Sequence, residues 1–329
     1  MPPKLYGGIE RIIDLLAREL VRLGHQVTLF AHPASVSAGR LMGYRGQSSA
    51  SCVDTFLNAA MITRYCLSNK VDVIHNFARL QYLLPMLPLR IPKLMTYQRA
   101  ITPRSVRIGD RLSRGTLQFA AISHHMVKSV AAIGTWHIVP NCASLQTYDF
   151  RPSVAADAPL MFLGRIEEIK GAHLAIEIAR RARRRLFIAG NVPEGGRSYF
   201  ETKIKPHIDN DQVVYVGPVD DVGKNRLLGQ ASALLMPLLW EEPFGIVMVE
   251  AMACGTPVLA LDRGAAPEVV EDGVTGFVQA NVDGLIEAVG RLDTIDRRMC
   301  RGRVEREYSD AVITEKYLAA YETVIAACK

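Results

Sequence analysis

Two successive series of short apolar runs, each followed by a helical pattern, constrain the fold of this chain more than any other feature. The first series comprises QVTLFA (26–31), VDVIHNF (71–77), KLMTYQ (93–98) and FAAIS (119–123). The second begins after residue 159 with LMFLG, RLFIAG, VVYVG, ALLMP and TPVLAL. Strands that alternate with helices form parallel sheets covered by helices. The sequence therefore predicts an α/β protein of two Rossmann-like, doubly wound domains that face each other across a cleft.

The length of the chain suits two domains of this kind. Its 329 residues are enough for two, since a domain takes about 150 residues. The apolar pattern lapses between Asn141 and Pro159, so we expect domains over 1–150 and 151–310. A last helix over 311–329 should pack back toward the first domain. A helical pattern starts almost directly after Pro3. Either the first domain lacks its central strand or that strand is encoded upstream, and we expect the latter.

Charge is distributed unevenly between the two halves. Residues 1–150 carry 17 Lys/Arg and 7 Asp/Glu, a net charge of +10, whereas residues 151–329 carry 22 and 26, a net charge of −4. A basic first half favours an anionic partner there. Nucleic acid is not the expected partner, because no helix-turn-helix, zinc-finger or RNP-like pattern accompanies the charge.

Other compositional features narrow the class of protein. No apolar run is long enough to span a bilayer, and no signal-peptide pattern opens the chain, so the cytoplasm is the expected compartment. The six cysteines show no metal-ligand spacing and predict reduced, mostly buried thiols rather than a metal site. Asp209 and Asp211 imitate a metal-binding pair, but a polar turn is the more common reading of such residues.

The segment WEEPFGIVMVEAMACGTPVLA, from Trp240, is the most informative part of the sequence. Its apolar run predicts a buried helix that begins after Gly245 and ends at Gly255. The free N–H groups and the dipole at such a helix start favour phosphate. Glu242 precedes the helix and can accept hydrogen bonds from sugar hydroxyls, while Glu250 can reach a ribose diol. An ordinary buried helix with a paired glutamate explains the spacing equally well.

These residues resemble the family-four retaining glycosyltransferases, the glycosyl transferases group 1, of the GT-B fold. The resemblance rests on E-x7-E with P-F-G between and E-A-M-A-C-G-T-P-V after it, and it covers nearly the whole chain. Similar stretches are LYGGIERIIDLLARELVRLGHQVTLFA (5–31), FLGRIEEIKGAHLAIEIA (162–179), DGVTGFV (272–278) and EKYLAAYETVI (315–325). The resemblance implies transfer of a hexosyl group from a nucleoside diphosphate sugar to an acceptor hydroxyl, with retention of the anomeric configuration. It also implies an acceptor-side first domain, a donor-binding second domain, and neither a metal nor a cofactor besides the substrate.

The donor site follows from the matched positions. Arg165 and Lys170 follow the strand LMFLG, where two cations can neutralise a diphosphate; without Gly164 and Gly171 beside them, solvated surface cations would be the default reading. With Glu242 they form the expected catalytic set. The expected donor-binding residues are Gly7, Gly8, Gly164, Phe244, Gly245, Ile246, Val247 and Glu250. Gly7 and Gly8 would let the backbone approach a ligand, although a plain turn before a helix also explains them.

Four further residues at strand ends are candidates for sugar or acceptor contacts: His75, Gln98, Arg99 and Ser123. For each alone, a satisfied structural role is the more common reading. Gln98 stands where family members commonly carry a histidine, and a glutamine cannot carry the charge of a protonated imidazole. A nucleotide-sugar-binding protein without turnover therefore stays an alternative, as does another GT-B enzyme such as a sugar-nucleotide epimerase.

Four arginines recur at helical spacing between Thr102 and Gly115 of the basic first half: Arg104, Arg107, Arg111 and Arg114. This spacing places them along one face of a helix. A solvated helix face is the usual explanation of such a stripe. Our hypothesis is that it attracts an anionic acceptor, such as a lipid-linked one, or brings the protein to the inner face of the membrane.

Overall fold

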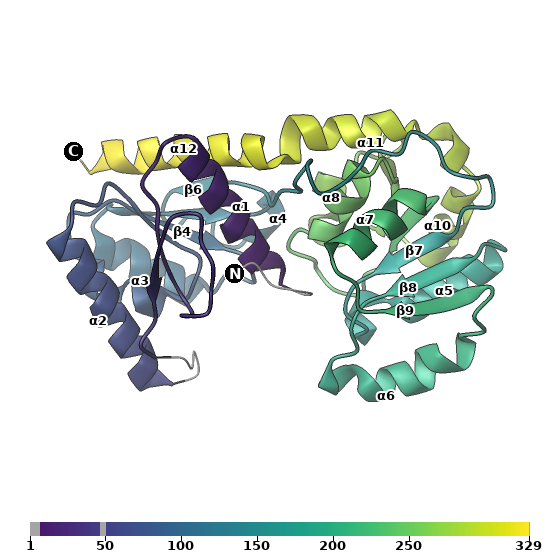
Figure 1. Cartoon of the computed structure of the whole chain (residues 1–329), viewed down its shortest axis with the longest axis horizontal. Helices are drawn as coiled ribbons and strands as arrows, with labels where there is room; N and C mark the ends of the chain where they lie inside the picture. Colours follow the sequence, from purple (N-terminus) through teal and green to yellow (C-terminus); the bar gives the residue numbers. More distant parts are fainter. Residues whose placement is uncertain (1–6, 47–50, 329) are drawn as a thin grey trace. The chain divides into compact units, whose positions relative to one another are not determined.

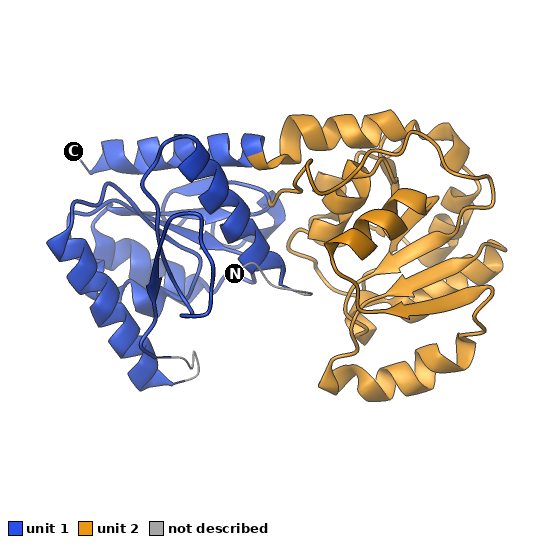
Figure 2. Ribbon diagram, in the orientation of Figure 1, with its two compact units in different colours: residues 1–3, 7–140, 311–329 blue, residues 4–6, 141–310 orange. Residues whose placement is uncertain are grey.

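The structure is a computed structural model that describes residues 7–46 and 51–328. The chain divides into two compact units, shown in different colours in Figure 2. Unit 1 comprises residues 7–140 and 311–328, and unit 2 comprises residues 141–310. The first division lies ten residues before the expected boundary, and the chain returns to unit 1 at Ala311. Leu5 and Tyr6 of the first glycosyltransferase-like stretch lie outside the described residues, as does the point where an upstream strand would join.

Unit 2 contains a six-stranded parallel sheet in the order β12-β11-β10-β7-β8-β9. Its chain runs outward from β7 to β9 and then returns to β10 on the other side of β7. This reversal makes the boundary between β7 and β10 the topological switch point of a doubly wound fold, where ligands bind beyond the carboxyl ends of the strands. The strands are β7 (Leu160–Leu163), β8 (Leu186–Ala189), β9 (Val213–Gly217), β10 (Ala233–Met236), β11 (Val258–Leu261) and β12 (Gly276–Gln279).

Helices surround this sheet in Figure 1. The expected helix after Gly245 is confirmed as α8. Its residues from Met248 to Ala253 are all buried, and its only charged residue is Glu250. The expected turn is also present: Asp209 Oδ1 accepts backbone hydrogen bonds from Asp211, Gln212 and Val213 at 2.8–3.0 Å. The longer helices of unit 2 are α5 (Ala172–Arg181), α7 (Asp221–Gln230), α8 (Ile246–Ala253), α10 (Val282–Val289) and α11 (Arg297–Arg303).

Unit 1 contains a four-stranded parallel sheet in the order β3-β4-β5-β6 and a separate parallel pair, β1-β2. The strands are β1 (Thr28–Ala31), β2 (Arg40–Gly43), β3 (Ile74–Asn76), β4 (Lys93–Tyr97), β5 (Leu117–Ala121) and β6 (Trp136–Ile138). The helices are α1 (Gly8–Arg22), α2 (Cys52–Ser68), α3 (Pro103–Ser113), α4 (His124–Val127) and α12 (Asp310–Ala327). The four expected strands of the first series are confirmed: three are somewhat shorter than expected, and β5 begins and ends two residues earlier.

One hydrophobic cluster holds α2 and α3 on the same side of the four-stranded sheet. Ile62 and Cys66 of α2 and Val106 of α3 pack in it with Leu117 and Phe119 of β5. Each of these side chains is less than a tenth exposed. The outward faces of the two helices therefore belong to one surface layer of unit 1. No helix within the described ranges is both long and apolar enough to cross a bilayer.

Candidate functional site

Two loops of unit 2 meet at the switch point, because they follow the neighbouring strands β7 and β10. The backbone N–H of Leu239 in the second loop donates to the carbonyl of Ile169 in the first at 2.9 Å. Gly171 has a φ of 76°, and a Cβ there would lie 2.0 Å from the carbonyl oxygen of Pro237. A residue without a side chain is therefore required for the loops to approach this closely.

These loops bring together the two expected catalytic residues Lys170 and Glu242. Lys170 Nζ lies 2.5 Å from Glu242 Oε2, and Trp240 Nε1 donates to the same oxygen at 3.1 Å. Lys170 Nζ also lies 4.6 Å from the centroid of the Trp240 ring, within the range of a cation–π interaction. Both charged side chains are mostly buried, at 15% and 12% exposed. The pair is thus held in place by short, charge-assisted contacts, and Trp240 is a member that sequence reasoning missed.

Arg165, the other expected cation, lies on the same loop after β7. Its Nη1 is 3.0 Å from Glu167 Oε1. The second carboxylate oxygen of Glu167 is buried, and no described residue hydrogen-bonds to it. Gly164 stands next to Arg165, and a Cβ on Gly190 would lie 1.7 Å from the Gly164 carbonyl oxygen. The start of this loop is therefore fixed by close backbone contact with the end of β8.

The start of α8 supplies a third expected element. Gly245 precedes the helix with a φ of 80° and gives it no side-chain cap. Its carbonyl accepts from Met248 N at 2.9 Å, and no side chain at the cap position covers the N–H groups at the start of α8. Ile246 and Val247 are partly exposed. Phe244 is 2% exposed, and its ring centroid lies 5.8 Å from that of Tyr308. Phe244 thus anchors the helix start in the core, and its contact with the donor stays a prediction.

Glu250 is paired within unit 2. Its Oε1 accepts from Tyr148 Oη at 2.6 Å and from Lys224 Nζ at 2.5 Å, and Lys224 also donates to Tyr148 Oη at 2.7 Å. Glu250 is only 5% exposed. The paired glutamate that the sequence left open is therefore present, and its contact with a ribose stays a prediction. No pattern in the sequence indicated Tyr148 or Lys224 as its partners.

His75 and Ser123 in unit 1 have structural partners. His75 Nδ1 lies 2.7 Å from Tyr321 Oη, and its Nε2 lies 2.7 Å from Thr96 Oγ1, so both ring nitrogens are engaged. Burial lowers the pKa of His75 to about 3, which keeps the ring neutral. Ser123 caps α4 by accepting from Met126 N at 3.3 Å. Both residues therefore have a structural role, and their contact with a sugar or an acceptor stays a prediction.

The remaining unit 1 candidates lie at the ends of regular elements. Gln98 and Arg99 follow β4, with Gln98 partly buried and Arg99 exposed. Gly7 has a φ of 155° and precedes α1 without a side-chain cap; its carbonyl accepts from Arg11 N at 3.2 Å. Gly8 is the first residue of α1. No contact of these residues with a sugar or phosphate is tested by the structure.

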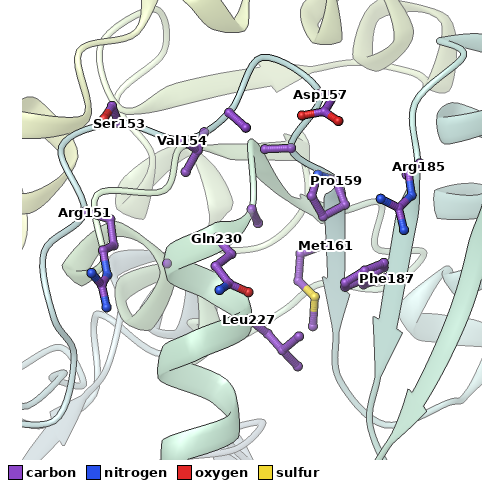
Figure 3. Close-up of a pocket in the computed structure, with 14 residues that line it drawn as sticks. Arg151, Ser153, Val154, Asp157, Pro159, Met161, Arg185, Phe187, Leu227 and Gln230 are labelled. Carbon is purple, nitrogen blue, oxygen red and sulfur yellow. The ribbon is translucent and has the colours of Figure 1, made fainter.

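A pocket of about 470 Å³ lies at the opposite edge of the unit 2 sheet from these loops, near the amino ends of β7 and β8. Figure 3 shows Met161, Phe187 and Leu227 on its apolar side and Arg151 and Arg185 on either side of it. Because parallel strands expose their carboxyl ends at one edge only, this pocket is separate from the candidate donor site.

Comparison with known families identifies both halves of the chain. Residues 6–146 match the model of "Glycosyltransferase Family 4", and residues 158–294 match that of "Glycosyl transferases group 1". The chain belongs to the family-four glycosyltransferases. The switch-point loops described above lie in the second matched region.

Individual relatives agree with this assignment. The glycosyltransferase is 26% identical to the phosphatidyl-myo-inositol mannosyltransferase of Mycobacterium leprae, over 97% of this chain and 93% of the relative. It is 32% identical to the D-inositol 3-phosphate glycosyltransferase of Kribbella flavida, over 50% of this chain and 43% of the relative.

Solved structures share the fold. Sucrose-phosphate synthase from Thermosynechococcus elongatus has a TM-score of 0.79 at 19% identity, with 99% of this chain and 96% of that chain covered. The Anabaena protein Alr3699/HepE in complex with UDP has a TM-score of 0.78 at 19% identity, with 98% and 97% covered. The glycosyltransferase therefore has the GT-B fold.

Proposed function

We propose that this glycosyltransferase moves a hexosyl group from a nucleoside diphosphate sugar to an acceptor hydroxyl, with retention of the anomeric configuration. The observation that carries the proposal is the placement of Arg165, Lys170, Glu242 and the start of α8 on the loops that follow β7 and β10, at the switch point of unit 2. Cations and a helix N-terminus at one sheet edge suit a diphosphate leaving group. The Anabaena protein Alr3699/HepE, which has this fold, has been solved in complex with UDP and in complex with UDP-glucose. These complexes support a nucleotide sugar as the donor.

The transfer requires one bond to break and one to form. The bond from the anomeric carbon to the diphosphate oxygen breaks, and the acceptor oxygen forms a bond to that carbon on the same face. The acceptor proton passes to the leaving diphosphate. Negative charge grows on the diphosphate during the step, and preorganised cations stabilise it there without reorganisation. Arg165, Lys170 and the α8 N–H groups take this role, so the scheme uses neither a metal nor a cofactor.

The remaining donor-binding residues contact different parts of the donor. Glu242, held by Lys170 and Trp240, accepts from sugar hydroxyls. Glu250, held by Lys224 and Tyr148, meets the ribose. Glycines such as Gly164 and Gly245 let the backbone approach the donor.

We place the protein in the cytoplasm, peripheral to the inner face of the membrane, with an anionic acceptor. The names of two relatives contain a phosphorylated inositol. On α3 of this chain, Arg104, Arg107 and Arg111 are exposed, and Arg114 follows the helix as another exposed cation. Such a stripe attracts phosphate groups.

The experiment is to incubate the protein with UDP-, GDP- and ADP-sugars and to measure release of the nucleoside diphosphate, with and without a lipid extract as acceptor source. Release stimulated by the extract, with an α-linked product from an α-linked donor by NMR, is expected. Tight binding of a donor without release would favour the binding-protein alternative, for which Gln98 is the motivating residue. Conversion of the donor to an epimer would favour the other enzyme class.

A further inference from the structure

Helix α2 of unit 1 presents large apolar side chains to solvent. Val53, Phe56 and Leu67 are 67%, 68% and 66% exposed, and Leu57 is 42% exposed. A surface helix of a globular protein normally turns its polar side outward. Contiguous exposed apolar side chains indicate a contact surface rather than ordinary scatter.

These side chains form one stripe opposite the buried face of α2. At 3.6 residues per turn they fall within an arc of about 100°. The stripe consists of Val53, Phe56, Leu57, Ala60, Arg64 and Leu67, all of which are exposed. The buried residues Asn58, Ala59, Ile62 and Cys66 lie on the other side of the helix. Helix α2 is therefore apolar on both faces, and the core of unit 1 accounts for only one of them.

Helix α3 adds exposed apolar side chains and cations to this layer. Helices α2 and α3 pack on one hydrophobic cluster and share one layer of unit 1. The outward side of α3 carries Arg104, Arg107 and Arg111 together with Ile108 and Leu112, which are 37% and 48% exposed. The surface thus combines apolar side chains with cations.

The charge on α2 and α3 indicates an anionic partner for this surface. On α2 and α3 themselves, four arginines are exposed, whereas the two aspartates, Asp54 and Asp110, are only partly exposed; the arginines are Arg64, Arg104, Arg107 and Arg111. A second copy of the chain meeting this face symmetrically would set cation against cation, which opposes association. An anionic bilayer offers an apolar phase for the stripe of α2 and phosphates for the arginines.

We propose that α2 and α3 form a membrane-docking surface, in which the stripe of α2 enters the headgroup region of an anionic bilayer and the arginines of α3 contact lipid phosphates. This inference rests on the peripheral membrane contact in the proposed function and assigns it to a defined surface. It does not depend on the transfer chemistry.

The test uses the full chain with vesicles of phosphatidylcholine and phosphatidylglycerol in equal amounts. Replacing Phe56 and Leu67 together by serine should lower vesicle binding about tenfold or more, because the apolar contribution to interfacial binding scales with the area buried. Val36→Ser is the matched control, since Val36 in unit 1 is 66% exposed but lies outside α2 and α3. The control should bind as the parent does. Phe56→Trp should show added fluorescence quenching by brominated lipid.

Three results would overturn the proposal: no vesicle binding by the parent chain, equal binding by the double serine variant, or no added quenching in Phe56→Trp. A parent that is dimeric in solution and a serine variant that is monomeric would also overturn it, by assigning the face to a second copy. Nucleoside diphosphate release from the donor, measured without vesicles, separates this outcome from failure of the transferase proposal. The double variant should retain that release and its circular dichroism spectrum.

Discussion

The charged side chains proposed to act in function are arranged in opposite ways in the two units of this glycosyltransferase. In unit 2, Lys170–Glu242 and Lys224–Glu250 are pairs at 2.5 Å, all four with side chains at most 15% exposed. In unit 1, the arginines of α3 are exposed. Fixed, partly dehydrated charge suits stabilisation of a developing charge, whereas displayed charge suits attraction of a partner and is weakened by salt. The comparison predicts that removing the buried charges of unit 2 lowers turnover. Removing the exposed charges of unit 1 should instead weaken binding of the acceptor.

The largest effect is expected at the loop after β7. Arg165→Ala and Lys170→Ala should each cost roughly 2–4 kcal/mol of transition-state stabilisation, the scale of one preorganised charged donor. Turnover of the donor, measured as nucleoside diphosphate release, checks this. Arg181→Ala is a suitable control, because Arg181 lies on α5 of the same unit in exposed ion pairs with Glu177 and Asp283. Near-parental turnover in both loop variants would exclude these cations from the donor site.

The next effect concerns a buried residue of unit 1. The pKa of His75 is about 3 in the folded protein because burial disfavours the charged ring, and the unfolded chain has an ordinary value near 6.5. As the pH falls below that value, the unfolded state takes up the proton first. Stability from His75 is therefore present above pH 6.5 and lost progressively toward pH 3, by about 2 kcal/mol between pH 8 and pH 5.

Replacement of His75 by glutamine should flatten this part of the pH dependence of the unfolding free energy, measured by urea titration. Exposed His25 provides the matched control, and His25→Gln should leave the slope as in the parent. An unchanged slope in His75→Gln would show that burial does not hold the His75 ring neutral in the folded protein.

The two glutamates of unit 2 should separate donor binding into two parts. Glu242→Gln should weaken binding of the nucleotide sugar about tenfold more than binding of the bare nucleoside diphosphate, the scale of a hydrogen bond to a charged group. Glu250→Gln should weaken both ligands alike, since ribose is common to them. Glutamine is preferred to alanine because its amide oxygen can still accept the hydrogen bond from Lys224, whereas alanine would remove that acceptor from a mostly buried ammonium group. Calorimetric titration with both ligands measures the difference, and equal profiles for the two variants would contradict the assignment.

Local patterns in the sequence predicted the backbone of unit 2 well. Its strands are short, apolar and bounded by glycines, and the helix after Gly245 follows directly from its uninterrupted apolar run. Contacts between side chains that are distant in the sequence could not be predicted in this way. Lys170 meets Glu242, 72 residues along the chain, because β7 and β10 become neighbours only when the sheet forms.

Unit 1 was less accessible to prediction. Strands β2 (Arg40–Gly43) and β6 (Trp136–Ile138) were missed because each is short and only partly buried, so neither has a clear apolar signal. The outward stripe of α2 was also missed, since a helix that is apolar on two faces has little periodicity. Among the candidates of this unit, His75 and Ser123 look like site residues by their position at strand ends, yet their partners are intramolecular.

The smallest effect is expected from the displayed charge of α3. Replacing Arg104, Arg107 and Arg111 together by glutamate should raise the apparent KM for an anionic acceptor several-fold at low salt, with a smaller effect at high salt because ions screen exposed charges beyond about 10 Å. Donor affinity should stay as in the parent, since no donor-binding residue of unit 2 is altered.

The matched variant replaces the same three arginines by lysine; it keeps the charge and should keep most of the attraction. Loss of acceptor affinity in the lysine variant as well would indicate recognition by the guanidinium groups themselves, through paired hydrogen bonds to phosphate. If the glutamate variant and the parent had equal acceptor KM at low salt, the arginines of α3 would be ordinary solvent-exposed residues without a role in acceptor binding. The proposed difference between the charges of the two units would then be wrong.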